Sequence, residues 1–257
     1  MSWSESDRRI VLWGASNFRD LGGYRTTDGR MLRWRRVFRS DGLYDLAPTD
    51  VSKLVGLGLG DVFDLRTAKE IEAFGTNPLV DHGVRHHHVP FLPDVGAHRH
   101  VRAVPAGRGA ASEDPDEAAD AYLQMLEDGR HSLVQVLNHA ARLGDRSMVF
   151  HCTGGRDRAG LTAAILLSAL GVPRDVIAAD YELTNEYLSF SPARIERLRA
   201  LFGDLIGDAG PPATTGDVMF RTLRRVDERY DSPDGFLDWA GFGTPEREML
   251  RSRLLEE

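Results

Sequence analysis

The residues best suited to chemistry in this sequence lie in one short segment, from His151 to Gly160. It holds the single cysteine of the chain, Cys152, and an arginine, Arg158, six positions later. A cysteine thiolate is a strong nucleophile, and the planar guanidinium of an arginine can bind two oxygens of a phosphate at once. The pair predicts attack by cysteine on a phosphate group.

The spacing of this pair carries little weight alone. All but two of the 32 basic residues are arginine, the exceptions being Lys53 and Lys69. In such a chain an arginine follows a cysteine at this distance by chance about once in nine tries. The context is more specific, because an apolar strand at 147–150 precedes the pair and an apolar helix at 158–170 follows it.

A loop between a strand and a helix can bind an anion through its backbone. Amides turned inward and the first amides of the helix form the site, and Gly154 and Gly155 allow the required backbone angles. The same field should lower the pKa of Cys152 from ~8.5 into the range ~3.5–7.5. We expect the phosphate to contact Thr153, Gly154, Gly155, Arg156, Ala159 and Gly160.

Other interpretations of these residues remain open. Cys152 could be a small buried hydrophobic residue and Arg158 a surface charge. His151 is expected to support the loop by ordering the backbone of Cys152, with a plain core role as the alternative.

At these residues the sequence resembles the cysteine-dependent protein tyrosine phosphatase superfamily, whose signature is His-Cys, five residues and Arg. Within it, the chain is similar to the atypical bacterial protein tyrosine phosphatase family, a group with a secreted mycobacterial member. Further matching blocks follow in the family's order, at 17–23, 38–41, 64–67 and 175–181 with Asn185.

The resemblance implies a phosphomonoesterase that hydrolyses phosphotyrosine, with phosphoserine, phosphothreonine or phosphoinositides as further substrates. Cys152 would take the phosphoryl group as a phosphocysteine, and Arg158 would bind the phosphate and stabilise the transition state. A carboxylic acid would protonate the leaving oxygen and then activate water. No metal or other cofactor is implied.

Two aspartates compete for the role of general acid. Asp64 ends a predicted strand in the family's Asp-Leu-Arg block, and Asp157 lies inside the loop. Asp64 could instead pair with Arg66, and Asp157 could shape the loop through its amides or arginines. We favour Asp64 as the acid and expect Asp157 to be essential in either case.

Two positions in the loop bear on turnover and substrate choice. The family commonly has a hydroxyl residue after the arginine, where this chain has Ala159, so the second step should be slow unless Thr153 or Thr162 substitutes. Arg156 adds a second cation that favours polyanionic substrates such as phosphoinositides. It could equally point into solvent or pair with an aspartate.

Two other features have candidate roles. Arg19 and Asp20 could brace the loop or reach substrate, with a structural ion pair as the alternative. His86 and His88 share one face of a predicted strand, but no further ligand pair is evident, so we expect no metal.

Two functions of other classes compete with the phosphatase hypothesis. One is a catalytically weak phosphate-binding module, favoured by Ala159 alone. The other is a persulfide sulfurtransferase acting through Cys152, which Asp157 and Arg158 fit less well.

The elements that must position these residues alternate between strand and helix. Strands are predicted at 37–39, 61–65, 84–91 and 147–150, and helices at 49–57, 69–74, 158–170, 174–185 and 192–205, with two helices in 119–143 broken near Gly129. This order predicts an α/β fold with a mostly parallel central sheet flanked by helices, tyrosine-phosphatase-like. We expect a single domain over 1–257, with a mobile lid or helical insertion at 93–128 and packed C-terminal helices at 190–257.

Composition limits the remaining classes. A net charge of −7 argues against broad nucleic-acid binding, and one cysteine excludes an intrachain disulfide. No apolar run reaches the ~18 residues of a membrane span. These features predict a cytoplasmic protein, or one exported without a recognisable signal. The substrate that the resemblance implies is a phosphorylated protein or a phosphoinositide. The composition leaves the oligomeric state open.

Overall fold

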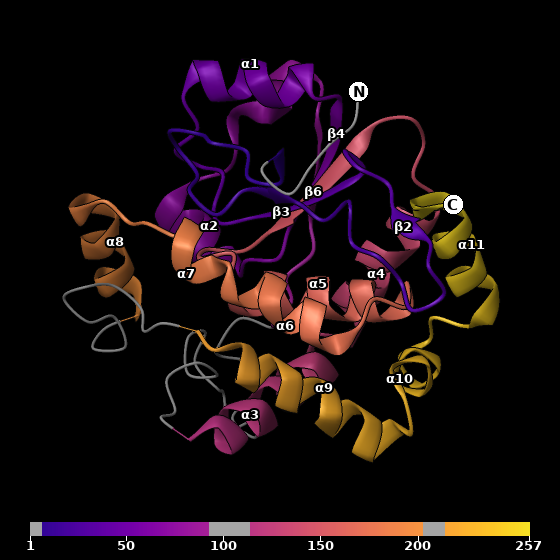
Figure 1. Ribbon diagram of the computed structural model, residues 1–257. Coiled ribbons are helices and arrows are strands. Elements are labelled where there is room, and N and C mark those ends of the chain that lie inside the picture. The colour runs from indigo at the N-terminus through magenta and orange to yellow at the C-terminus, as the bar shows by residue number, and fades with distance from the viewer. Residues whose placement is uncertain (1–6, 93–113, 203–213) are drawn as a thin grey trace.

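The computed structural model describes residues 7–92, 114–202 and 214–257 (Figure 1). A five-stranded sheet runs through its centre, with β1 antiparallel to β3 and all other neighbours parallel. The mixed α/β fold with a mostly parallel sheet is therefore as predicted. In order across the sheet the strands are β1 (Arg19–Asp20), β3 (Val37–Ser40), β6 (Ser147–His151), β4 (Leu59–Asp64) and β5 (Arg85–His88).

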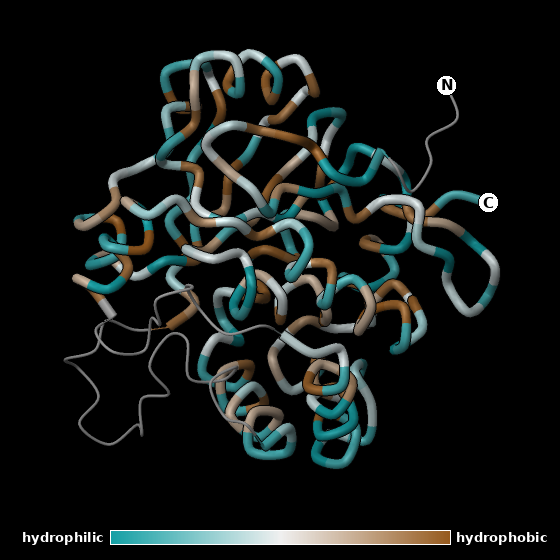
Figure 2. The backbone as a smooth tube through the Cα atoms, turned by 60° about the vertical axis from the view of Figure 1, so that its left-hand side comes forward, coloured by the Kyte–Doolittle hydropathy of each residue, from teal (hydrophilic) through white to brown (hydrophobic). Residues whose placement is uncertain are grey.

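Alternate side chains of the central strands enter two separate hydrophobic cores. In β6, Met148 and Phe150 belong to one core and Val149 to the other. Helix α1 (Pro48–Gly56) covers one face of the sheet, and α4 (Arg130–Ala141) and α5 (Asp157–Ala169) lie on the opposite face (Figure 1). Hydrophobic residues are accordingly concentrated along the central strands (Figure 2).

The remaining elements surround this layered centre. They are α2 (Ala68–Phe74), the short 3-10 helix η2 (Pro78–His82), α3 (Pro115–Asp128), α6 (Arg174–Glu182), α7 (Thr184–Tyr187), α8 (Pro192–Phe202), α9 (Gly216–Tyr230), α10 (Pro233–Ala240), α11 (Thr244–Leu254), and the antiparallel pair β2 (Met31–Leu32) and β7 (Leu255–Glu256).

Most predicted elements lie within two residues of their expected bounds, and the break near Gly129 separates α3 from α4. The strand predicted at 84–91 is shorter and spans Arg85–His88, although the amides of Val89 and Phe91 still bond to the carbonyls of Asp64 and Leu65. The helix predicted at 174–185 divides into α6 and α7, where the Leu183 carbonyl accepts bonds from Glu186 and Tyr187. Of the predicted lid, residues 93–113 lie outside the described residues.

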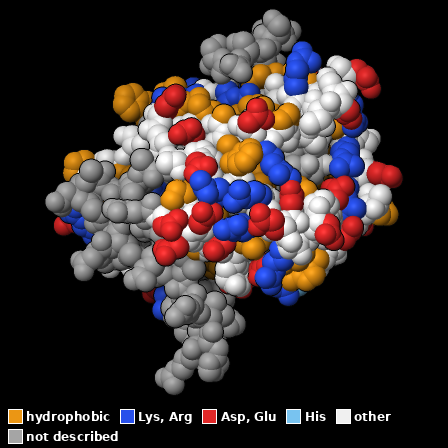
Figure 3. Space-filling model, turned by 60° about the horizontal axis from the view of Figure 1, so that its bottom comes forward, with side chains coloured by type: hydrophobic (Ala, Val, Ile, Leu, Met, Phe, Trp, Pro, Cys, Tyr) orange, Lys and Arg blue, Asp and Glu red, His pale blue; other side chains and the backbone are white. Residues whose placement is uncertain are grey.

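Helix α3, the described part of that segment, packs against α9. Arg225 pairs with both Asp116 and Asp120 across the two helices, and Arg221 also reaches Asp116. Charges of both signs therefore alternate on this face of the molecule (Figure 3). Among the described residues no helix is both long and apolar enough to cross a bilayer.

Candidate active site

The predicted phosphate loop connects β6 to α5 at the carboxyl end of the sheet, as the strand–glycine–helix pattern indicated. Cys152 follows the last residue of β6 and is 2% exposed. Gly155 has a φ of +65°, and a Cβ there would lie 2.5 Å from the amide nitrogen of Asp41 and the carbonyl oxygen of Ser40. Only glycine fits this position without moving β3 or the loop.

The carbonyl groups of the loop are held on its outer side. Asn17 donates to the carbonyls of Gly154 and Gly155, both at 3.3 Å. Arg39 reaches the Gly155 carbonyl at 2.8 Å, and Arg194 of α8 reaches that of Thr153 at 2.9 Å. In a trans peptide the N–H points away from the preceding carbonyl. The amides of residues 154–156 are therefore directed toward the inner side of the loop, where an anion can accept from them.

The guanidinium of Arg158 is fixed by Glu70 of α2. Its Nη1 and Nη2 each lie 2.6 Å from a different oxygen of Glu70, and the Thr153 hydroxyl donates to the same carboxylate. Burial alone would raise the pKa of Glu70, but the charge and hydrogen bonds of Arg158 outweigh it and lower that pKa to about 2. Glu70 holds Arg158 in one orientation beside the loop.

Glu70 is not among the site residues predicted from the sequence, although a local signal for it is present. Thr67, three positions earlier, caps α2, and Glu70 bonds back to the Thr67 amide at 2.9 Å. This Thr-x-x-Glu capping box is visible in sequence, but its second use, the contact with Arg158, is not.

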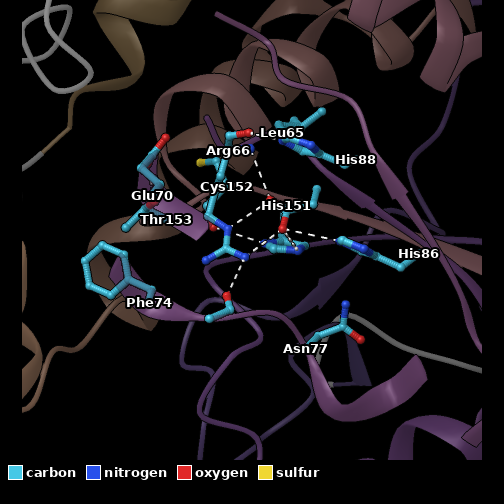
Figure 4. Close-up of polar contacts among 12 residues, drawn as sticks. Leu65, Arg66, Glu70, Phe74, Asn77, His86, His88, His151, Cys152 and Thr153 are labelled. Atoms are coloured by element: carbon cyan, nitrogen blue, oxygen red, sulfur yellow. Dashed lines mark hydrogen bonds and ion pairs between the residues drawn. The ribbon is translucent and has the colours of Figure 1, made fainter. Parts of the chain in front are cut away.

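Asp64 lies behind the loop and is fully buried. Arg66 binds it through two bonds, from Nε at 2.9 Å and Nη2 at 2.6 Å, and Nε2 of His86 lies 3.4 Å away (Figure 4). Burial opposes ionisation, yet the hydrogen bonds and the charge of Arg66 keep the pKa of Asp64 well below its usual range.

His151 links this buried pair to the nucleophile. Its Nε2 lies 3.8 Å from Asp64, and its Nδ1 lies 3.2 Å from the carbonyl of Cys152. Burial lowers the pKa of His151 to about 4 and so keeps the ring neutral. This contact with the Cys152 backbone is compatible with the supporting role predicted for His151, which stays a prediction.

Asp157 lies at the other side of the loop, in the first turn of α5. Its side chain is 15% exposed, and it accepts hydrogen bonds from the Tyr122 hydroxyl and from Nε of Arg156 at 3.2 Å. Burial raises its pKa, but the charge of Arg156 and the bond from Tyr122 lower it by more. The Tyr122 hydroxyl also lies 2.7 Å from that of Tyr181. Arg156 is itself buried, so its guanidinium faces Asp157 and not open solvent.

Arg19 and Asp20 have different surroundings. Arg19 is buried against Asp180, with Nε 3.1 Å from Oδ1, and it donates to the side chain of Asn17. Asp180 also binds Arg39 at 2.7 Å, so one carboxylate anchors two arginines of the shell around the loop. Asp20 instead accepts from the amides of Gly22 and Arg35 and shapes a turn.

The remaining loop positions face protein groups. Ala159 is fully buried in the larger hydrophobic core, and Gly160 packs toward the Tyr181 ring. The Thr162 hydroxyl donates to the Arg158 carbonyl at 2.8 Å, and that of Thr153 to Glu70. Both hydroxyls suggested as substitutes at Ala159 therefore have other acceptors.

Comparisons with known proteins identify the family of this chain. A family model described as "Tyrosine phosphatase family" matches residues 10–256. The chain is 28% identical over 273 residues to the triple specificity protein phosphatase PtpB of Mycobacterium tuberculosis, covering 94% of this chain and 97% of that one. It is 32% identical to a tyrosine-protein phosphatase of Nostoc commune, over 54% of this chain and 50% of that one.

A solved kinase associated phosphatase is also similar, at 15% sequence identity and a TM-score of 0.29, over 76% of this chain and 87% of that one. That likeness is too low to add to the argument. The family model spans the loop, the anchored arginine and the surrounding shell together, and on that match the chain belongs to the tyrosine phosphatase family.

Proposed function

We propose that this protein hydrolyses phosphotyrosine through a phosphocysteine on Cys152, with Arg158 as the phosphate ligand. The orientation of Arg158 carries the proposal, because Glu70 fixes both of its terminal nitrogens at 2.6 Å. A guanidinium held in advance binds the equatorial oxygens of the transition state without losing further rotamer entropy. The thiolate forms a bond to phosphorus as the bond from phosphorus to the phenolic oxygen breaks.

Hydrolysis of a phosphotyrosine peptide by wild type and Cys152→Ser tests the proposal. The variant should show no turnover above background, while circular dichroism confirms that it folds. Residual turnover in Cys152→Ser would rule out the nucleophile. A parallel assay of sulfur transfer from thiosulfate to cyanide should be negative for both proteins, and a positive wild type with no phosphatase activity would favour a persulfide enzyme.

We infer that Asp157, and not Asp64, is the general acid, which changes the preference drawn from sequence. Asp64 is closed off from solvent and bound by Arg66 on both oxygens, so it has no route for a proton to the leaving group. Asp157 is partly exposed and begins the helix next to Arg158. Asp64 then acts as a positioning residue through His151.

The dependence of rate on the leaving group separates the two aspartates. An acid matters most for a basic leaving group such as tyrosine, so Asp157→Asn should lose about 10²–10⁴-fold on phosphotyrosine and much less on p-nitrophenyl phosphate. Asp64→Asn should reduce both rates by a similar factor. The reverse pattern would return the acid role to Asp64.

The second chemical step should be the slower one. In the family that this chain resembles, a hydroxyl residue after the loop arginine helps the thiolate to leave phosphorus. This chain has Ala159 at that position. Rapid-quench measurements on wild type should show a burst of product and an accumulating phosphocysteine. Ala159→Thr should shrink the burst and raise the steady-state rate. A wild type without a burst would contradict a slow second step.

The substrate range extends the same proposal. The similarity to a triple specificity protein phosphatase supports testing phosphoserine and phosphothreonine peptides and phosphoinositides beside phosphotyrosine. The sequence predicted polyanionic substrates because of the charge of Arg156. In the structure Nε of Arg156 lies 3.2 Å from Asp157, so this charge is paired within the protein. We therefore place phosphotyrosine first, and expect the lowest kcat/KM for phosphoinositides.

A further inference from the structure

A second group of polar side chains lies on the opposite face of β4 from Asp64. Asp61 of β4, His87 of β5 and His139 of α4 each place one ligand atom within 4.8 Å of the other two. Nε2 of His87 lies 2.8 Å from Oδ1 of Asp61, and Nε2 of His139 lies 3.3 Å from Oδ2. Among the described parts of the chain, this is the one trio of such side chains close enough to share an ion.

One atom of this group lacks the partner that its burial calls for. Nε2 of His139 is inaccessible to solvent and has no hydrogen-bond partner among the described residues, despite its closeness to Asp61. A buried polar atom without a partner is destabilising. A cation between the two imidazoles and the carboxylate would satisfy it.

The group is preorganised and also reachable. The Phe63 ring stacks on His87 with centroids 4.5 Å apart and the planes 14° from parallel, which holds the imidazole in place. An open cleft of about 370 Å³ is lined by both histidines together with Gln135 and Asn138. The cleft therefore gives solvent access to the two histidine rings, and its water can complete the coordination of an ion.

Arg85 is the main competitor for Asp61. It binds both carboxylate oxygens, at 2.8 Å and 2.7 Å, but its own side chain is 66% exposed. An exposed arginine can move into water at little cost. It can also stay on one oxygen while the other binds a metal, as an outer partner of the ligand.

We propose that Asp61, His87 and His139 form a binding site for a divalent first-row metal ion, with Zn²⁺ as the best fit. Two imidazoles and one carboxylate are a ligand set that Zn²⁺ accepts, with a fourth position left for water. The site is separate from the phosphate loop, because Asp61 and Asp64 project to opposite faces of the sheet, and it is independent of the proposed phosphatase function.

Calorimetric titration of untagged Cys152→Ser with Zn²⁺, in a buffer without phosphate, tests the site without interference from the thiol. We expect one equivalent that His139→Gln and His87→Gln weaken by at least about tenfold. His131→Gln, an exposed histidine on the same helix, is the matched control and should bind as Cys152→Ser does. Zn²⁺ should also raise the Tm of Cys152→Ser, but not the Tm of the same protein with His139→Gln added.

Either of two results would overturn the proposal: no binding by Cys152→Ser, or undiminished binding by His139→Gln. If the histidine variants fail to fold, anomalous diffraction from Cys152→Ser crystals soaked in Zn²⁺ decides the matter. A peak between Asp61, His87 and His139 supports the site, and its absence there rejects it.

Discussion

Two aspartates of β4 form arginine pairs that have nearly the same geometry and very different surroundings. Arg66 binds Asp64 at 2.9 Å and 2.6 Å, and Arg85 binds Asp61 at 2.8 Å and 2.7 Å. The side chains of the first pair are both 0% exposed, whereas that of Arg85 is 66% exposed. The first pair is closed off from solvent, and the second has an exposed arginine that can exchange its carboxylate for water. Burial, more than bond length, decides which role an ion pair can have.

Replacing the arginine of each pair should distinguish the two pairs most clearly. Arg66→Gln leaves the charge of Asp64 buried without its partner, and should cost about 3–5 kcal/mol of unfolding free energy. Arg85→Gln lets water replace an exposed guanidinium and should cost at most about 1 kcal/mol. Urea unfolding of the two variants measures both losses. Equal losses would mean that burial does not separate the pairs.

Acid should first destabilise the buried region around Asp64 and His151. The folded protein holds His151 neutral with a pKa lowered to about 4, while the unfolded chain binds a proton near pH 6.5. The stability contributed by the neutral ring is therefore complete above pH 6.5. It falls as pH drops from about 6.5 to about 4, by up to about 3 kcal/mol.

Urea unfolding of His151→Gln between pH 7 and pH 4.5 tests this loss. The variant should have a flatter profile than wild type. His139→Gln should flatten it less, since the His139 side chain is 26% exposed. A His151→Gln profile parallel to wild type would contradict the assignment of a neutral buried ring.

Two glycines with positive φ angles sharpen the contrast at the level of packing. Gly155 has a φ of +65° and Gly83, which precedes β5, a φ of +77°. Alanine at either position carries a left-handed cost of about 1–2 kcal/mol. A Cβ meets no atom within 4 Å at Gly83, whereas at Gly155 it meets β3 backbone at 2.5 Å.

Gly155→Ala should therefore lose about 1–3 kcal/mol more than Gly83→Ala. It should also lose phosphatase activity, while Gly83→Ala keeps it. Thermal unfolding and kcat/KM of the two variants measure the difference, and an active Gly155→Ala would show that the loop can shift from β3.

Salt should give the smallest effect. Raising the ionic strength from 0.1 M to 1 M shortens the Debye length from about 10 Å to about 3 Å. In double-mutant cycles the coupling of Arg85 to Asp61 should fall by a few tenths of a kcal/mol, as exposed pairs do. The coupling of Arg66 to Asp64 should not change, and a matching fall would indicate that solvent reaches the buried pair.

Local patterns predicted the strand, loop and helix around Cys152 because those elements are contiguous. The glycine positions and the apolar flanks each constrain the same short stretch, so their signals reinforce one another. Alternation along the strand also placed His86 and His88 on one face, and they contact Asp64 and the Arg66 carbonyl.

The shell around the loop could not be predicted from local patterns, because its residues come from distant parts of the sequence. Asn17 contacts a loop carbonyl across 138 positions, and Arg39 and Arg194 come from β3 and α8. In a chain with so many arginines, no local pattern distinguishes the two that bind the loop. The choice between Asp64 and Asp157 likewise depended on how deeply distant elements bury each side chain. The alternation of side chains along a strand does not reveal this.

The sequence positions of the shell residues also determine when, during translation, the loop can be fully held. The loop carbonyls are held by side chains from Asn17 to Arg194, so Cys152 and Arg158 leave the ribosome before the last of their supports. A nascent chain that ends before α8 carries the nucleophile without the bond that fixes the Thr153 carbonyl. The growing polypeptide thus completes its reactive loop only late in translation, after α8 has emerged.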